Sequence, residues 1–144
     1  GIAAGAASAT HRVGIDADRL NRFVGDGGRQ LATARIFMSE EELTWFQAQP
    51  VALHPLAFLT IWCGKEVLYK IFNDLHGSGL SFRQEVPVTP PALQPGVQRY
   101  QTQGTYQPLE GQLPVQQLTL QYKVLAAPAA LLCWGAWQQA ATAG

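Results

Sequence analysis

Five charged residues in two short segments of this 144-residue chain have the types and spacing that phosphate chemistry requires. Asp16 and Asp18 are two residues apart, so in an extended strand both carboxylates point the same way. Glu66 and Lys70 are one helical turn apart, and Lys65 precedes Glu66. If the strand and the helix pack side by side, three carboxylates suit Mg²⁺, and two ammonium groups would stabilise phosphate oxygens during transfer. The set therefore predicts Mg²⁺-dependent phosphoryl transfer from a diphosphate.

Both segments also have simpler interpretations. A Glu–Lys pair four residues apart is the commonest ion pair on helix surfaces and contributes only ~0.3–0.5 kcal/mol. Asp16 and Asp18 would equally suit the end of a strand that enters a turn. Gly64 weakens the first of these interpretations, because glycine inside a helix costs about 1 kcal/mol relative to alanine. It predicts that another group approaches the helix closely at this point.

The element that carries Glu66 and Lys70 is a central helix predicted from Pro55 to Phe72. This segment has no internal proline, and its large apolar residues recur mostly at three- and four-residue spacing, as in a helix with one buried stripe. Trp62 lies one turn before Glu66 on the same side and is predicted to be structural. The acidic pair belongs to a short strand predicted from Arg12 to Asp18, in which Val13 and Ile15 share one face.

The remaining elements indicate an α+β fold. Arg29 to Phe37 predicts a helix, and Ser39 with Glu42 forms a capping-box pattern before a short helix that ends near Phe46. The second half has alternating or short apolar runs separated by Pro and Gly, which favours an antiparallel sheet packed against the long central helix. These runs are 80–88, 98–107, 114–125 and 129–137. We expect a single domain over 11–138, a flexible leader over 1–10 and a tail over 139–144.

Composition excludes some classes of partner. The formal net charge is zero, so nothing in it favours nucleic acid or an anionic membrane. No apolar run is expected to span a membrane, which needs ~20 residues. Cys63 and Cys133 match neither a zinc spacing nor a disulfide framework, so buried reduced thiols in a cytoplasmic protein are expected. His11 is expected to be a surface histidine.

Two motifs, Val13-Gly14-Ile15-Asp16-Ala17-Asp18 and Trp62-Cys63-Gly64-Lys65-Glu66-Val67-Leu68-Tyr69-Lys70, resemble those of the 4'-phosphopantetheinyl transferase superfamily. Its signature is G-[IV]-D-x-[ED] followed by W-x-x-K-E-[AS]-x-x-K. The linking segment Arg35 to Leu43 is also similar to the family's basic-aromatic, Ser/Thr and Glu-Glu segment. The order and spacing of the motifs make the resemblance fairly specific, and it covers roughly residues 12 to 88.

The resemblance implies transfer of the 4'-phosphopantetheine group of coenzyme A to a serine of an acyl or peptidyl carrier protein, with Mg²⁺ as cofactor. Asp16 and Glu66 would be metal ligands, and Asp18 would take the second acidic position. Glu66 would help to remove the serine proton, directly or through a metal-bound water. Lys70 and Lys65 would neutralise the pyrophosphate of coenzyme A. The family usually has Glu where Asp18 stands, so direct binding of the ion by Asp18 stays open.

The family also implies that more than one lobe builds the site. Small members, the holo-acyl-carrier-protein synthases, trimerise, whereas larger members have two similar halves and a Ser-His-Ser segment in the first. Because this sequence lacks that segment, we expect either a homo-oligomer or a C-terminal lobe whose N-terminal partner is missing. A non-catalytic lobe that binds coenzyme A or a carrier protein, and a metal-dependent hydrolase of nucleotide diphosphates, remain alternatives. The sequence does not indicate whether fatty-acid, polyketide or peptide synthesis is served.

Overall fold

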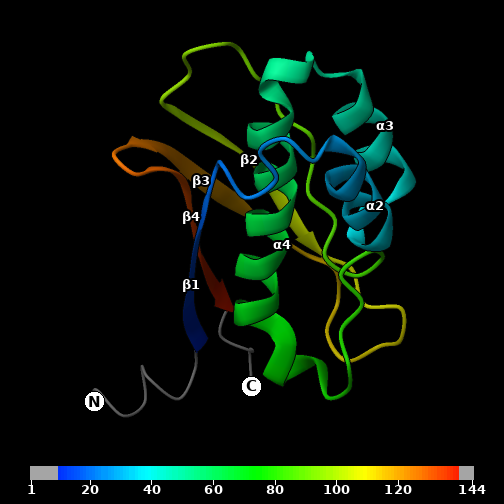
Figure 1. Cartoon of the computed structure of the whole chain (residues 1–144). Coiled ribbons are helices and arrows are strands. Elements are labelled where there is room, and N and C mark those ends of the chain that lie inside the picture. The colour runs from blue at the N-terminus through cyan, green and yellow to red at the C-terminus, as the bar shows by residue number, and fades with distance from the viewer. Residues whose placement is uncertain (1–9, 140–144) are drawn as a thin grey trace, which may run out of the picture.

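The computed structural model describes residues 10–139. Helix α4 lies between an antiparallel sheet and the pair formed by α2 and α3 (Figure 1). The predicted leader and tail fall outside the described residues, except for Thr10 and Gln139, which belong to strands. The elements are β1 Thr10–Arg19, α2 Gly27–Phe37, α3 Glu40–Ala48, the 3-10 turn η1 Val51–Leu53, α4 His54–His76, β2 Arg99–Tyr106, β3 Gln116–Ala126 and β4 Ala129–Gln139.

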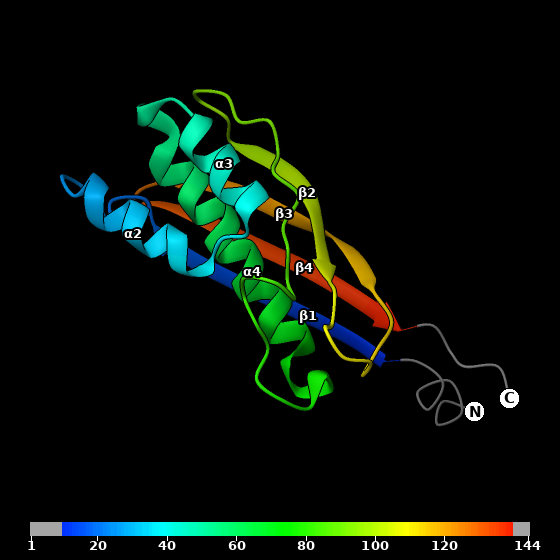
Figure 2. The ribbon, with the colours of Figure 1, turned by 90° about the vertical axis from the view of Figure 1, so that its right-hand side faces the viewer.

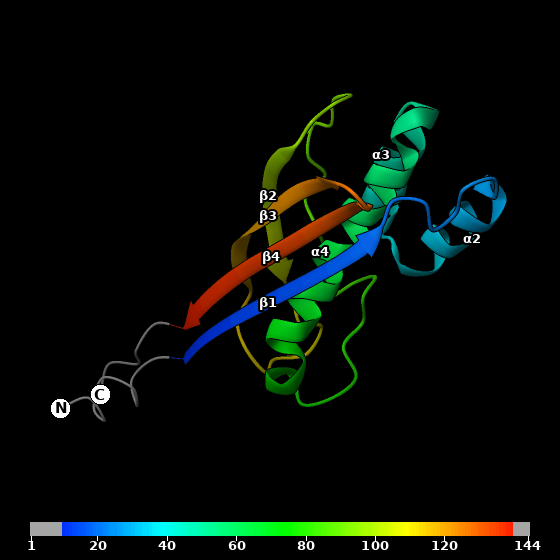
Figure 3. The same ribbon diagram turned by 60° about the vertical axis from the view of Figure 1, so that its left-hand side comes forward.

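The sheet has the order β1-β4-β3-β2, and every neighbouring pair is antiparallel. Its strands lie side by side on one side of α4 (Figure 2), and β1 forms one edge beside β4 (Figure 3). The inward-facing residues of β3 and β4 are apolar and pack with α4 into the core; they include Leu118, Leu120, Tyr122, Leu131, Cys133 and Trp137. The predicted α+β class is confirmed.

Helix α4 is the predicted central helix and runs one turn beyond Phe72. Pro55 lies in its first turn, and Gly77 ends it in the left-handed conformation with φ 83°. By length and composition alone Val51–His76 is apolar enough to cross a membrane, contrary to our expectation, yet 56% of its most apolar window is buried in the fold. The burial is that of a core helix, whose stripe is covered by the sheet and by α2 and α3.

Gly64 lies at a close approach, as predicted. A Cβ atom at this position would be 2.6 Å from Tyr122 Oη and 3.0 Å from Val88 Cγ2. The Tyr122 hydroxyl in turn donates a hydrogen bond of 2.8 Å to the carbonyl of Thr60. The absent side chain therefore leaves room for the Tyr122 side chain of β3 to reach the backbone of α4.

The strand predicted over 80–88 is wrong. Phe82 to Glu85 form a turn and Val86 a bend, and Val88 alone in this run makes an isolated bridge, to Gly104 of β2. The Glu85 carboxylate accepts a hydrogen bond from the Ser81 amide and closes the turn. The carbonyls of Phe82 and Val86 accept hydrogen bonds from a buried lysine, described below, whereas those of Glu85 and Pro87 accept from backbone amides of Gln107 and Thr105. The capping box of Ser39 and Glu42 is present at the start of α3.

Candidate active site

The candidate site lies where β1 crosses α4, and a glycine determines how closely they approach. A Cβ atom on Gly14 would lie 2.7 Å from the carbonyl oxygen of Val67 and 3.1 Å from Ile71 Cγ1. Glycine therefore allows the strand backbone to contact the helix directly. Asp16, two residues on, faces the same side as Gly14, and Glu66 precedes Val67 on the helix. Strand β1 and helix α4 thus bring Asp16 and Glu66 close to each other.

Lys70 connects the helix to the strand beside Asp16. Its Nζ donates hydrogen bonds to the Ile15 carbonyl, at 2.7 Å, and to Asp16 Oδ1, at 3.2 Å. The Lys70 side chain is 45% exposed. An ammonium group carries three donors, so this one retains a donor for a further anionic ligand.

Glu66 is the residue whose ionisation the site changes. Burial raises the pKa of its carboxyl above the ordinary value of 4.5, the Asp16 charge raises this pKa further, and the Lys70 ammonium opposes both. The ion pairs of residues 10–139 do not include Glu66. Asp16 and Glu66 therefore form a pair of neighbouring carboxylates whose repulsion is only partly neutralised, and a bound cation would relieve it.

Asp18 does not join the pair formed by Asp16 and Glu66. Its Oδ2 lies 2.7 Å from Arg22 Nη1, and its Oδ1 accepts a hydrogen bond of 2.8 Å from the Arg19 amide. Within the described part of the chain no group of three or more His, Cys, Asp or Glu residues could hold a metal ion. The structure thus brings Asp16 and Glu66 together, while the predicted third acid is engaged by an arginine that the sequence analysis missed.

Lys65 is directed into the fold rather than toward the acids. Its side chain is 0% exposed, and its Nζ lies 2.9 Å from Glu42 Oε1, whose own side chain is 2% exposed. The ammonium also donates to the carbonyls of Phe82 and Val86. Glu42 completes the arrangement, because it accepts hydrogen bonds from the backbone amides of Ser39 and Val88. The geometry gives no support to the predicted contact between Lys65 and coenzyme A, and it gives Lys65 a structural task instead.

Trp62 packs beside the site as an anchor of α4. Its ring centroid lies 5.0 Å from that of Phe37 in an edge-to-face contact and 5.8 Å from that of Phe82. These contacts hold the turn of α4 that carries Glu66, in agreement with the structural role predicted for Trp62.

The thiol of Cys63, beside Asp16, is held in its neutral form. Burial raises the pKa of Cys63 far above its ordinary value, and the charge of Asp16 and a hydrogen bond with it act in the same direction. Both Cys63 and Cys133 are free and buried, as expected. His11 is exposed, also as expected.

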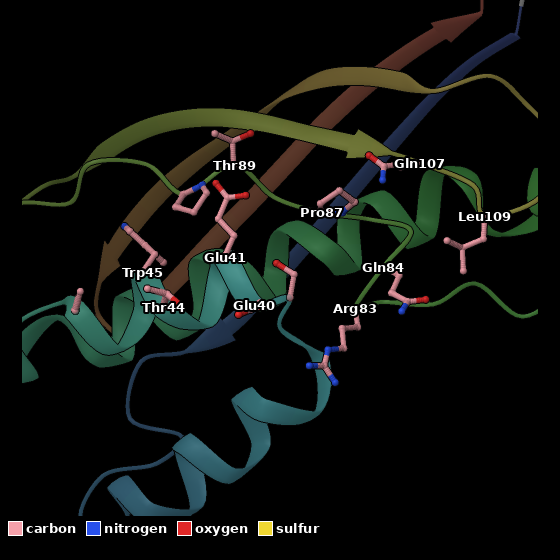
Figure 4. Close-up of a pocket in the computed structure, with 13 residues that line it drawn as sticks. Glu40, Glu41, Thr44, Trp45, Arg83, Gln84, Pro87, Thr89, Gln107 and Leu109 are labelled. Carbon is pink, nitrogen blue, oxygen red and sulfur yellow. The ribbon is translucent and has the colours of Figure 1, made fainter.

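A separate open groove of about 1110 Å³ lies between α3 and the segment that follows Gln84. Figure 4 shows Glu41 and Trp45 of α3 on one wall and Thr89 on the other, with Arg83 near the start of α3. None of the five predicted site residues lines it, so the acidic pair lies outside this groove.

Comparison with known proteins agrees with the motifs. A family model described as the 4'-phosphopantetheinyl transferase superfamily matches residues 12–123, a range that contains most of β1, all the helices, β2 and most of β3. No curated protein matches the chain.

Proposed function

We propose that this chain, which belongs to the 4'-phosphopantetheinyl transferase superfamily, moves the 4'-phosphopantetheine group of coenzyme A to a serine of an acyl or peptidyl carrier protein. The family match supports phosphopantetheinyl transfer in general. The carrier protein as acceptor and Mg²⁺ as cofactor are part of our proposal. The observation that carries the proposal is the convergence of Asp16 and Glu66, from the two family motifs, beside the half-exposed Lys70.

The donor set fits a magnesium ion. Mg²⁺ is commonly bound by one or two carboxylates together with phosphate oxygens of the substrate and water, and Asp16 with Glu66 offers two. Burial raises the pKa of Glu66 and repulsion by Asp16 raises it further, and a cation that binds between the two carboxylates removes this repulsion. A bound Mg²⁺ would neutralise charge on the pyrophosphate of coenzyme A.

The residues of this chain then have separate tasks. Glu66 accepts the proton of the carrier serine, directly or through a water molecule. The serine oxygen forms a bond to the phosphorus that bears the pantetheine group. The bond from this phosphorus to the bridging oxygen breaks, and adenosine 3',5'-bisphosphate leaves with that oxygen and its electron pair. Lys70 would place its remaining donor near the phosphates and stabilise the charge that develops there.

The site lies at the edge of the sheet, which supports the proposal that a second lobe or a second copy covers it. Among residues 10–139, strand β1 pairs with β4 alone, and its outward residues Val13 and Ile15 are each 57% exposed. Trp134 is the cross-strand partner of Ile15. We propose that these apolar residues contact the covering lobe, which would supply the surface that the adenosine part of coenzyme A needs.

The test is transfer to an apo acyl carrier protein incubated with the chain, coenzyme A and Mg²⁺, followed by mass spectrometry of the carrier. We expect the carrier to gain one phosphopantetheinyl mass. The gain should be lost with Glu66→Gln and retained with Glu41→Gln, a matched control in which an exposed carboxylate of α3 is neutralised.

The other outcomes distinguish the alternatives. Cleavage of coenzyme A without a carrier would indicate a hydrolase of nucleotide diphosphates. Binding of coenzyme A without transfer would indicate a non-catalytic lobe. A chain that neither binds nor transfers would overturn the proposal.

A further inference from the structure

The pairing of Asp18 with Arg22 bears on how the proposed cation is bound. Asp16 and Asp18 project from the same face of β1, since they are two residues apart in a strand. The Arg22 guanidinium lies 2.7 Å from Asp18, and the two side chains are 44% and 25% exposed. Asp18, the carboxylate that would serve as a third metal ligand, is therefore already neutralised by Arg22.

Arg22 is held on a second side by aromatic rings. Its Cζ atom lies 5.5 Å from the ring centroid of Phe23 and 5.7 Å from that of Trp62. Both rings are packed against the core, Phe23 on Phe58 at 4.9 Å and Trp62 on Phe37 at 5.0 Å. The carboxylate and the two fixed rings contact the guanidinium at the same time, so these contacts together hold Arg22 in one position.

A cation and Arg22 compete for the same carboxylate. Binding a divalent ion through Asp18 would require the ion pair to break and would leave the Arg22 charge close to a second positive charge. Resting on the proposed function, we propose that Arg22 keeps Asp18 out of the cation site. The ion is then held by Asp16 and Glu66 and completes its coordination with phosphate oxygens, so that cation binding depends on coenzyme A.

Binding of Mn²⁺, measured from the electron paramagnetic resonance signal of the free ion, tests this without any transfer reaction. With wild-type chain we expect weak binding that coenzyme A strengthens about tenfold or more, within the usual range of coupling between ligands. In Arg22→Gln, Asp18 is released, and Mn²⁺ alone should bind about fivefold more tightly, the effect of an ion pair of up to about 1 kcal/mol. The added effect of coenzyme A should shrink accordingly.

Two further variants separate release of Asp18 from simple loss of positive charge. Arg29 also lies over the Phe23 ring, at 5.9 Å, and has no ion-pair partner among the described residues. Arg29→Gln should therefore leave Mn²⁺ binding unchanged. The double variant Asp18→Asn/Arg22→Gln should bind Mn²⁺ with the same affinity as Asp18→Asn. Removing Arg22 then gives no gain in affinity, because no carboxylate is left to release.

Each result decides the inference. If the wild type binds Mn²⁺ and coenzyme A but Arg22→Gln changes neither the affinity nor the coupling, the role of Arg22 is refuted and the proposed function stands. If the gain persists in the double variant, Arg22 acts by repulsion alone and the inference is again wrong. If the wild type binds neither ligand, the proposed function fails and the inference fails with it.

Discussion

Replacing Lys65 by methionine should destabilise the chain severely, because the ammonium is the partner of a carboxylate that has no access to water. Lys65→Met keeps most of the side-chain volume and removes the charge. The Glu42 carboxylate, 2% exposed, would lose its ion pair at 2.9 Å. The carbonyls of Phe82 and Val86 would lose the donor that both now share.

The size of the loss follows from burial of both partners. Removing one partner of a buried ion pair typically costs about 3–5 kcal/mol, because the other charge stays buried and uncompensated. The whole free energy of unfolding of a domain is about 5–15 kcal/mol. We therefore expect Lys65→Met to lose about 4 kcal/mol and to melt about 10–15 °C below the wild type. Lys70→Met, five residues along the same helix, removes a half-exposed pair and should cost about 1 kcal/mol or less.

Urea unfolding followed by far-ultraviolet circular dichroism and tryptophan fluorescence measures both variants. The double variant Glu42→Gln/Lys65→Met should recover part of the loss, since it leaves no unpaired charge in the interior. A loss of less than about 1 kcal/mol for Lys65→Met would refute the buried pair. Retained stability with lost binding of coenzyme A would restore the phosphate-binding role predicted from the sequence.

Three other predictions concern the packing of α4 and the site. Gly64→Ala should destabilise by about 1–3 kcal/mol in urea unfolding despite the better helix propensity of alanine, because its Cβ would lie 2.6 Å from Tyr122 Oη; a more stable variant would contradict this packing. Carboxyl NMR titration should show Glu66 with a raised pKa that falls in Asp16→Asn, and an unchanged pKa would mean that the two acids do not face each other. Because the folded state holds this proton to higher pH than the unfolded chain, Glu66 should make stability fall as pH rises from about 4.5 through the raised pKa. Lys70→Met should weaken coenzyme A binding, measured by calorimetry, about tenfold while the fold persists, and unchanged affinity would exclude Lys70 from the phosphate site.

The sequence was sufficient for the elements whose signals are local. The apolar spacing and Pro55 predicted the long helix, and the Ser39–Glu42 pattern predicted the capping box that the structure contains. The cost of a glycine inside a helix predicted a close neighbour at Gly64, which is the hydroxyl of Tyr122. For the helix and the capping box the physical cause acts within a few residues of the chain, whereas the neighbour of Gly64 is a tertiary contact whose partner depends on the fold.

Two of the features that were missed depend on contacts between distant segments, and the third, the pair of Arg22 and Asp18, spans four residues across a turn. The run over 80–88 has the composition of a strand, but Lys65 donates hydrogen bonds to two of its carbonyls, and pairing with β2 is limited to the end of the run, where Val88 bridges Gly104. Glu42 was predicted only as a cap, yet one of its oxygens also pairs with Lys65, which is far along the chain. The contact of Arg22 with Asp18 requires the turn after β1, whose shape the sequence does not specify.

Helix geometry explains why the two lysines of one motif have different tasks. Residues five apart on an α-helix differ in direction by about 140°, whereas residues four apart nearly coincide. Glu66 and Lys70 therefore face β1 together, and Lys65 turns toward the segment after Phe82. A motif that contains both lysines thus combines a face directed at β1 with a face directed into the core. It follows that any loss of transfer in Lys65→Met should match the unfolded fraction, whereas loss in Glu66→Gln should occur in a fully folded chain.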